Sequence, residues 1–310
     1  MLVNASEILE LTKIGLREIY FQELDAPGQN YTNLFDVQTS DKAIEQFFNM
    51  AGFGPVSQWD SDGQPMNWDA PIMGDRYTWT HQDYAMAWAV SHKAIRDDLY
   101  QKMGKELVSA AALSTRHTIE QTCINVFNDG FTATGYDSKV FFANDHPRLD
   151  GGASSNLLSA VALSESAIET ALIQIKNAKN ERGQPVVYSP QVLLIPPDLE
   201  FTAKKILGIG STVRSVVNDT VTTGTAVVGG TVPNHLDGII PQVIVSPYLT
   251  ATGKYFIGCA PNQRFTKFFW REKPTYDAWK DFETKGIANS VNFAFSVGYT
   301  NYKGWFGGGV

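Results

Sequence analysis

Two adjacent residues, Asp145 and His146, form the most chemically suggestive pair in this sequence. A carboxylate beside an imidazole can perform general acid–base work, because the imidazole changes charge near neutral pH. The pair lies in a turn-rich segment, residues 131–156, where Asp and Pro favour turns for backbone reasons alone. Neither G-x-S-x-G nor H-E-x-x-H accompanies it. A hydrolase that uses His146 and Asp145 is therefore kept only as the enzymatic alternative.

The other chemistry-bearing patterns indicate no reaction. Metal-ligand spacing is lacking among the remaining histidines, which are His81, His92, His117 and His235, and His81 is expected on a strand face. Gly208-Ile209-Gly210 follows a predicted helix instead of a strand and lacks a third glycine, so it is not a dinucleotide-binding loop. The two cysteines are too few for a disulfide framework. We therefore predict no catalytic residues, no cofactor, no cofactor-binding residues and no metal ligands.

Charge and composition exclude several classes of protein. The 310 residues carry 25 basic and 32 acidic side chains, a net charge of -7, and 43% are hydrophobic, which is unlike a disordered chain. No stripe of Lys and Arg is present, which argues against a protein that grips nucleic acid through its phosphates. No run approaches the roughly 20 apolar residues of a transmembrane helix, and charged residues interrupt the N-terminal segment where a secretory signal would lie. We expect a soluble chain with a sizeable core.

The first half of the chain predicts helices separated by an irregular arm. A capping pattern at Asn4 and a one-sided apolar pattern predict a helix that Ala26-Pro27-Gly28 ends. Residues 30–48 indicate an irregular arm with a short helix from Asp41. Residues 94–128 repeat apolar positions at steps of three and four, which predicts one continuous spine helix.

An aromatic, extended segment occupies residues 51–90, which contain four of the seven tryptophans. Gly and Pro interrupt its first half, and its second half alternates with the period of a strand. A two-stranded ribbon is marginal in water by itself, so these aromatic side chains need cover. We predict that Trp59, Trp68, Tyr77 and Trp79 make contacts between subunits. The alternative is that the ribbon folds back on its own spine helix.

The second half of the chain predicts an α/β region followed by long strands. Helices are expected after Ser164 and from Asp198 to Leu207, and residues 211–234 are expected to form a loop. Strands are expected at residues 192–195, 239–245, 255–259, 264–269 and 291–297. With helices in the middle and strands toward the end, the sequence predicts an α+β fold.

Short sequence words in a fixed order carry a family resemblance. They are Leu16-Arg17-Glu18-Ile19-Tyr20-Phe21-Gln22 with Tyr31, Trp59, Gly74-Asp75-Arg76, Asp83-Tyr84, Ile95-Arg96-Asp97-Asp98-Leu99, Gly130-Phe131, Tyr136-Asp137, Phe141-Phe142-Ala143-Asn144-Asp145-His146-Pro147, Gly151-Gly152 and Ser155-Asn156. In this order they resemble the major capsid protein of tailed bacteriophages, most closely the Mu-like major head subunit family. The resemblance covers most of residues 1–160 and is looser beyond, and residues 58–66 depart from it with a turn-rich sequence of their own.

The resemblance implies the tailed-phage major capsid fold, an α+β fold. Its parts would be an N-terminal arm (1–48), an extended β-hairpin loop (49–92), a peripheral domain with the spine helix (93–158), an axial α/β domain (159–258) and returning strands (259–310). It also implies a structural protein that assembles as hexamers and pentamers into an icosahedral shell around viral double-stranded DNA. An acidic surface suits a shell that must not grip the DNA it encloses.

The resemblance implies a set of partners as well. These are further copies of the chain, a portal protein, a scaffolding protein, a decoration protein and encapsidated DNA without sequence-specific contacts, but no membrane. The scaffold is expected to be a separate protein, because the sequence opens at Met1 with its arm and shows no long helical extension. The implied location is the virion capsid, after assembly in the host cytoplasm. The alternative within this fold is an encapsulin-like nanocompartment shell with an enzyme cargo.

Overall fold

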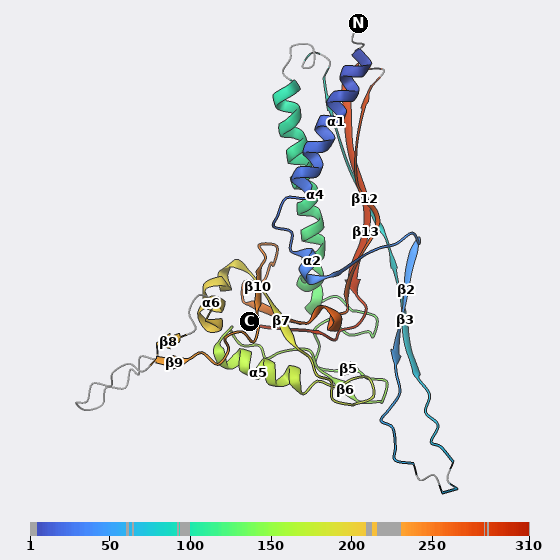
Figure 1. Ribbon diagram of the computed structural model, residues 1–310, viewed down its shortest axis with the longest axis vertical. Helices are drawn as coiled ribbons and strands as arrows, with labels where there is room; N and C mark the ends of the chain where they lie inside the picture. The colour runs from blue at the N-terminus through green and yellow to red at the C-terminus, as the bar shows by residue number, and fades with distance from the viewer. Residues whose placement is uncertain are drawn as a thin grey trace, which may run out of the picture. The chain divides into compact units, whose positions relative to one another are not determined.

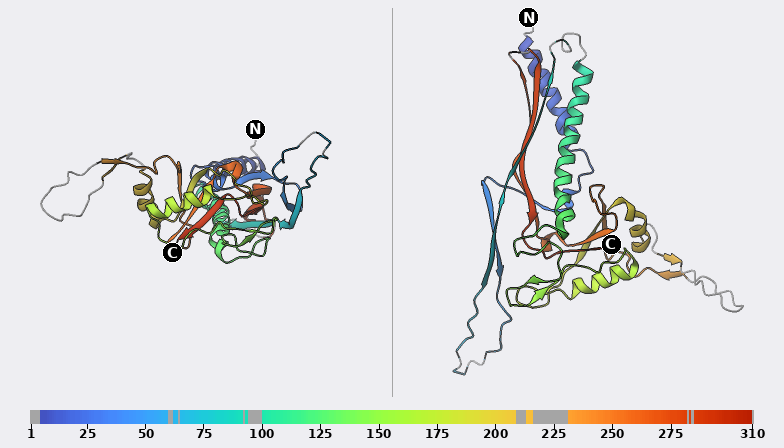
Figure 2. Two further views of the ribbon diagram at one scale, coloured as in Figure 1. Left: turned by 90° about the horizontal axis from the view of Figure 1, so that it is seen from below. Right: turned by 180° about the vertical axis from the view of Figure 1, so that it is seen from behind.

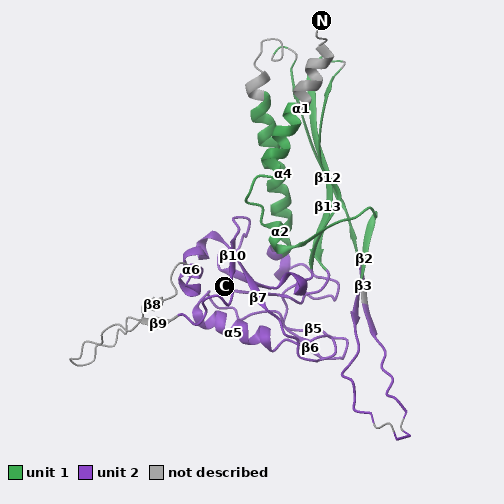
Figure 3. Ribbon diagram, in the orientation of Figure 1, with its two compact units in different colours: residues 1–47, 78–126, 266–299 green, residues 48–77, 127–265, 300–310 purple. Residues whose placement is uncertain are grey.

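The computed structural model shows a chain divided into two compact units. It describes residues 5–59, 62–63, 65–91, 93, 100–208, 213–215, 231–281, 283 and 285–309. Unit 1 comprises Met1–Phe47, Thr78–Val126 and Thr266–Tyr299, and unit 2 comprises Phe48–Tyr77, Phe127–Phe265 and Thr300–Val310 (Figure 3). Helices and sheets occur in both units (Figure 1), so the predicted α+β class is confirmed.

Two helices accompany the long strands of unit 1 (Figures 1 and 2). They are α1 (Ala5–Leu24) and α4 (Tyr100–Asn128). The fully buried Tyr20 of α1 donates a hydrogen bond to Thr115 of α4 (3.0 Å) and stacks on Tyr276 of a long strand, with ring centroids 5.7 Å apart. The predicted N-terminal and spine helices are confirmed over these ranges. The expected cap Asn4 and the first residues of the expected spine helix, 94–99, lie outside the described residues.

The sheet of unit 1 has the strand order β1-β12-β13-β4. Its strands are β1 (Asp36–Thr39), β12 (Thr266–Lys280), β13 (Ile287–Tyr299) and β4 (Gln82–Val90). The β12–β13 pair is antiparallel, β1 runs parallel to β12, and β4 runs antiparallel to β13. Phe268 of β12 stacks on Phe295 of β13 with ring centroids 4.9 Å apart. The strands predicted from the alternating pattern near the C-terminus are therefore confirmed.

The arm between α1 and the extended segment differs from expectation. It contains the short helix α2 (Tyr31–Leu34), strand β1 and strand β2 (Ile44–Ala51). The predicted helix from Asp41 is wrong, because the backbone of this arm is satisfied by distant strands. The Ser40 N–H donates to the carbonyl of Trp270 (2.8 Å), and β2 pairs with β3 (Ile72–Thr80) and alternates in exposure. Local helix propensity does not decide the conformation of a segment whose backbone hydrogen-bond partners lie elsewhere in the chain.

Strand β2 pairs with β3 (Ile72–Thr80) in a two-stranded ribbon. Residues 52–71, called the extended loop below, join the two strands (Figure 2). The structure thus divides the aromatic segment 51–90: β3 belongs to the ribbon, whereas β4 is an edge strand of the sheet in unit 1. His81 lies in the connection between β3 and β4 and is buried, so its expected place on a strand face is wrong.

Unit 2 contains a second four-stranded sheet, with the order β10-β7-β11-β14. Its strands are β7 (Pro190–Ile195), β10 (Gln242–Val245), β11 (Lys254–Cys259) and β14 (Trp305–Gly309). The helices α5 (Glu165–Lys176) and α6 (Glu200–Leu207) contribute to its core, together with leucine and isoleucine side chains of β7. The hydroxyl of Ser164 accepts a hydrogen bond from the Ala167 N–H (3.2 Å), which confirms the expected helix cap.

Shorter elements complete the described chain. They are η1 (Asp129–Phe131), β5 (His146–Pro147), β6 (Ala153–Ser154), η2 (Pro197–Leu199), β8 (Val213–Ser215), β9 (Thr231–Pro233) and η3 (Pro261–Gln263). Most of the expected loop at 211–234 lies outside the described residues. No helix in the described ranges combines the length and the apolar character that crossing a membrane requires.

Candidate assembly surfaces

Exposed apolar side chains concentrate on the extended loop and its ribbon. They are Ile44, Phe48, Met50, Phe53, Val56, Trp59, Met66, Trp68 and Met73. Such a concentration of exposed apolar side chains indicates a site of interaction, because a subunit gains free energy by removing apolar surface from water. The segment also carries polar residues between these positions, as the rim of a protein interface does. The arrangement can bind a protein surface, but it holds no reactive constellation.

The four residues predicted to lie at subunit contacts fall into two pairs. Trp59 and Trp68 lie on the extended loop, with 49% and 93% of their surface exposed. Tyr77 is half-buried within unit 2, where it stacks on Tyr136 (centroids 4.9 Å apart) and donates a hydrogen bond to the carbonyl of Thr300.

Trp79 is half-buried within unit 1. Its ring centroid lies 4.8 Å from that of Phe47 and 6.0 Å from that of Phe269, and its indole lies against Gly298. The structure therefore does not bring the four predicted residues together in one patch.

The two ends of the extended loop meet at a neck formed by Gly54 and Asp69. One oxygen of the Asp69 carboxylate accepts a hydrogen bond from the Gly54 N–H (2.6 Å), and the other lies 3.0 Å from Nη1 of Arg182. A second nitrogen of Arg182 donates to the carbonyl of Ala70. The Gly54 N–H and the Arg182 guanidinium together hold the pKa of the Asp69 carboxyl below its usual range.

Arg182 is presented by a tight turn between two paired residues, Lys179 and Pro185. The side-chain carbonyl of Asn180 accepts from the Arg182 N–H and the Gln184 N–H, both at 2.9 Å. This arrangement satisfies the backbone of the turn locally, as Asn side chains do. The backbone that carries the Arg182 side chain is therefore held in one conformation.

A buried ion pair anchors the same turn from behind. The Glu181 carboxylate lies 2.6 Å from Nζ of Lys303, and both side chains are almost completely buried. Glu181 also accepts a hydrogen bond from the Leu149 N–H (3.4 Å), and its backbone carbonyl accepts from the Asp150 N–H (3.1 Å). Because removing one member of such a pair leaves the other charge buried, this contact resists local opening of the turn.

The Asp145–His146 pair does not form an acid–base dyad. Nδ1 of the fully buried His146 lies 2.6 Å from Asp137 and its Nε2 lies 3.1 Å from Asn156, while its ring stacks on Tyr302 (centroids 3.7 Å apart). Asp145 is exposed and pairs instead with Lys139. A buried imidazole that both polar neighbours already bind has no access to substrate. The hydrolase alternative is therefore wrong, because His146 takes its carboxylate from nine residues earlier in the chain.

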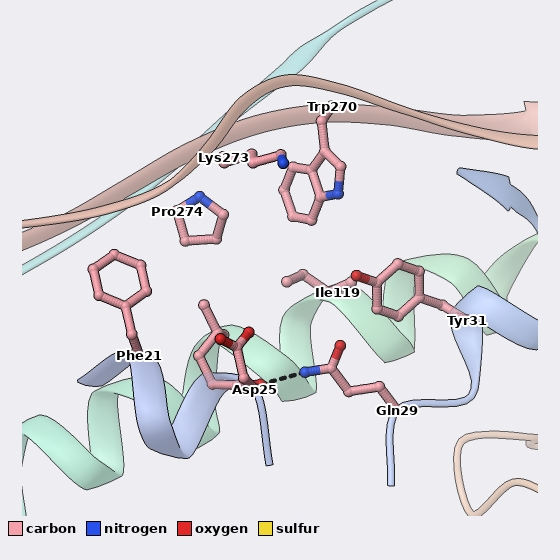
Figure 4. Close-up of a pocket in the computed structure, with 9 residues that line it drawn as sticks. Phe21, Asp25, Gln29, Tyr31, Ile119, Trp270, Lys273 and Pro274 are labelled. Atoms are coloured by element: carbon pink, nitrogen blue, oxygen red, sulfur yellow. Dashed lines mark hydrogen bonds between the residues drawn. The ribbon is translucent and has the colours of Figure 1, made fainter. Parts of the chain in front are cut away.

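A pocket of about 360 Å³ lies in unit 1, between α1, α4 and β12 (Figure 4). Its lining residues are Phe21, Leu24, Asp25, Gln29, Tyr31, Ile119, Trp270, Lys273 and Pro274. A Gln29 side chain on its floor donates to the carbonyl of Leu24. The lining holds one carboxylate and one ammonium, with no cysteine, serine or histidine to act as nucleophile or base. Within the described part of the chain, no three His, Cys, Asp or Glu side chains gather as a metal site either.

The neck residues Gly54, Asp69 and Arg182 were missed from the sequence. Arg182 follows the helix expected after Ser164, and Asp69 lies 113 residues earlier in the chain. The only local signal was the Asn180-x-x-Gly183 pattern, which is typical of a turn. Such a pattern predicts that a turn forms, but it does not predict which distant residue binds the side chains of that turn.

Known proteins of the same fold are capsids and related shells. The phage capsid protein family matches residues 76–307, about three quarters of the chain. The virus-like particle from Pyrococcus furiosus is 12% identical, covering 95% of this chain and 97% of that one, with a TM-score of 0.54. The decorated capsid of bacteriophage JBD30, which carries minor capsid protein trimers, is 15% identical, covering 74% and 94%, with a TM-score of 0.53.

An encapsulin complex from Synechococcus elongatus PCC 7942 is 10% identical, covering 91% of this chain and 86% of that one, with a TM-score of 0.51. At these identities the structures show a shared fold and nothing finer. No curated protein matches the sequence. The family match covers parts of both compact units, and it shows that this chain belongs to the phage capsid protein family, as a structural major capsid protein and not an enzyme.

Proposed function

We propose that this capsid protein builds the head shell of a tailed bacteriophage of the Mu-like kind. Copies would assemble as hexamers and pentamers into an icosahedral shell around double-stranded DNA. The observation that carries the proposal is the extended loop, where Trp68 has 93% and Trp59 has 49% of its surface exposed in the subunit. A second copy of the chain is the partner that a closed shell supplies at every position.

The assignment of parts follows the same proposal. Residues 1–48 would act as the arm and 49–92 as the extended β-hairpin region, which includes the extended loop, with 93–158 and 259–310 in the peripheral domain and 159–258 in the axial domain. A portal protein, a separate scaffolding protein and a decoration protein would complete the particle, which would assemble in the host cytoplasm. The JBD30 capsid, which is decorated with minor capsid protein trimers, supports the decoration protein as a partner class.

The second candidate is an encapsulin-like nanocompartment, which the similarity to the Synechococcus encapsulin favours. The two functions differ in content, because a phage head encloses DNA and a nanocompartment encloses a protein cargo. Purified particles would therefore be tested for nuclease-protected DNA and for a co-purifying enzyme. Protected genome-length DNA supports the phage head, and a stoichiometric enzyme without DNA supports the nanocompartment.

The experiment that tests the loop's role replaces its tryptophans one at a time. Trp59→Ala and Trp68→Ala are expected to raise the protein concentration needed for particle formation about 30-fold, because truncating an aromatic anchor at an interface costs about 2 kcal/mol or more. The matched control is Trp279→Ala, since Trp279 on β12 is 49% exposed, as Trp59 is. Sedimentation and negative-stain microscopy measure the particles. Equal thresholds for all three variants would contradict the proposed role of the loop.

A further inference from the structure

The neck of the extended loop is closed by a hydrogen bond that joins its two sides. Asp69 holds Gly54, on the opposite side of the neck, through its N–H (2.6 Å). Just beyond this neck lie Val56 and Trp68, which are the most exposed apolar side chains among the described residues of the loop. The chain thus holds the base of the loop through its own contacts, while these two apolar side chains stay exposed.

Arg182 ties this neck to the body of unit 2. Its guanidinium contacts both the Asp69 carboxylate (3.0 Å) and the Ala70 carbonyl, so it fixes two successive residues of one side of the loop. A planar guanidinium that binds two acceptors restricts direction as well as distance, which a flexible ammonium does not. The contact therefore orients the loop where it leaves the unit.

The support behind Arg182 is rigid. Asn180 orders the turn, and the buried Glu181–Lys303 pair (2.6 Å) holds the adjacent residue. The Cβ that an alanine would add at Gly74 on strand β3 meets the Leu149 side chain at 3.0 Å, which shows how closely the ribbon packs on the same unit. Two sets of contacts, at residues 69–70 and at residue 74, thus hold one side of the loop.

We infer that Arg182 is a positioning residue for assembly. It sets the direction of the extended loop in the free subunit, so that the loop is already in its binding orientation when a second copy of the chain binds it. The inference rests on the proposed role of the loop. Its physical basis is the entropy of association, because ordering a segment before binding removes that cost from the binding step. Arg182 itself does not need to touch the neighbouring copy.

The test uses Arg182→Ala and Asp69→Asn in the full chain. Both variants are expected to raise the particle-forming concentration about tenfold, the order of effect of releasing one or two backbone residues. Their melting temperatures as unassembled subunits should stay within about 3 °C of wild type, because the Asp69 carboxylate is exposed and ion pairs at the surface stabilise little. Lys204→Ala is the matched control, since Lys204 forms an exposed ion pair with Glu200 in the same unit.

A second readout separates positioning from a merely structural role. A spin label at Val56→Cys reports the motion of the loop in unassembled subunits, where the two native cysteines are buried. Arg182→Ala is expected to increase the mobility of the label. At about 1 M salt, which screens the ion pair, wild type should approach the variant in both label mobility and particle-forming concentration.

Three results would overturn the inference. They are an unchanged particle-forming concentration in Arg182→Ala, an unchanged label mobility despite a raised concentration, and a fall in melting temperature that matches the loss of particles. Failure of the proposed function gives a different result, because Trp68→Ala would then assemble at the wild-type concentration. Increased label mobility in Arg182→Ala would still support the positioning of the loop in that case.

Discussion

Trp305 and Trp68 belong to the same compact unit but have opposite surroundings. Trp305 is fully buried: its ring lies 4.7 Å from that of Phe127, the guanidinium of Arg264 lies over it at 5.6 Å, and Gly258 leaves room for it. Trp68 has 93% of its surface exposed. One subunit therefore removes the first indole from water and leaves the second in it.

The comparison separates the contacts that fold the subunit from those available to join subunits. A large aromatic side chain gains free energy wherever its surface is covered, and a single chain covers only some of its aromatic residues. Those in the core, such as Trp305, stabilise the subunit regardless of assembly. Those on the extended loop are expected to act only when a second copy is present, so their effects should appear in particle formation and not in unfolding.

The largest effect is expected for Trp305→Ala. Emptying this site should destabilise the unassembled subunit by about 3–5 kcal/mol, because the neighbouring rings cannot collapse fully into the space. Denaturant unfolding followed by circular dichroism measures the change. Trp68→Ala is the control and should alter the free energy of unfolding by no more than about 0.5 kcal/mol. Similar losses of stability in the two variants would contradict the distinction between a core tryptophan and a loop tryptophan.

Trp79→Ala is expected to give an intermediate effect, because this indole has partners within its own unit. Losing its contacts with Phe47 and Phe269 should cost the subunit about 1–2 kcal/mol. The predicted contact between subunits would add a further loss that appears only in particle yield. Thermal melting of the subunit and particle yield are therefore measured side by side. A yield that falls only in proportion to the melt would assign Trp79 to its own subunit alone.

The smallest effect is expected from titration of Asp69. Its hydrogen bond from Gly54 and the Arg182 guanidinium hold its pKa below the ordinary value of an aspartate, about 3.9. A group whose pKa is depressed in the folded state stabilises that state fully at pH values above its unfolded pKa. This stabilisation is lost as the pH falls through the folded pKa. Loop mobility at label position 56 should therefore stay constant from pH 8 to about pH 5 and rise only below about pH 4. A midpoint at or above the ordinary value would contradict the neck geometry.

Regular elements with strong periodicity could be predicted from the sequence. The helix after Ser164 buries the predicted apolar face, and the continuous apolar strand at 192–195 is buried throughout, because each packs in a core within its own unit. The spine helix forms as predicted, although its Leu107 and Leu113 are exposed. The arm around Asp41 could not be predicted in this way. Its structure depends on strands more than two hundred residues later, such as β12, whose Trp270 pairs with Thr39.

The candidate site was predicted only in part. An excess of tryptophan over local apolar sequence indicated the loop, and Trp59 and Trp68 are exposed there, as a role at an interface requires. Tyr77 and Trp79 share the same pattern but pack within their own units, since alternation along a strand does not distinguish a face covered by the chain from one left bare. Their role between subunits stays a prediction.

Composition, periodicity and the order of short motifs determined the class of this protein, because fold class depends on patterns that each segment carries within itself. Only the tertiary structure decided how residues far apart in the chain pair. It placed Asp137 and not Asp145 against His146, and it brought Arg182 to Asp69 at the neck of the loop. Such pairs are set by the packing of whole units, since a side chain meets its partner only after the elements on both sides have found their places.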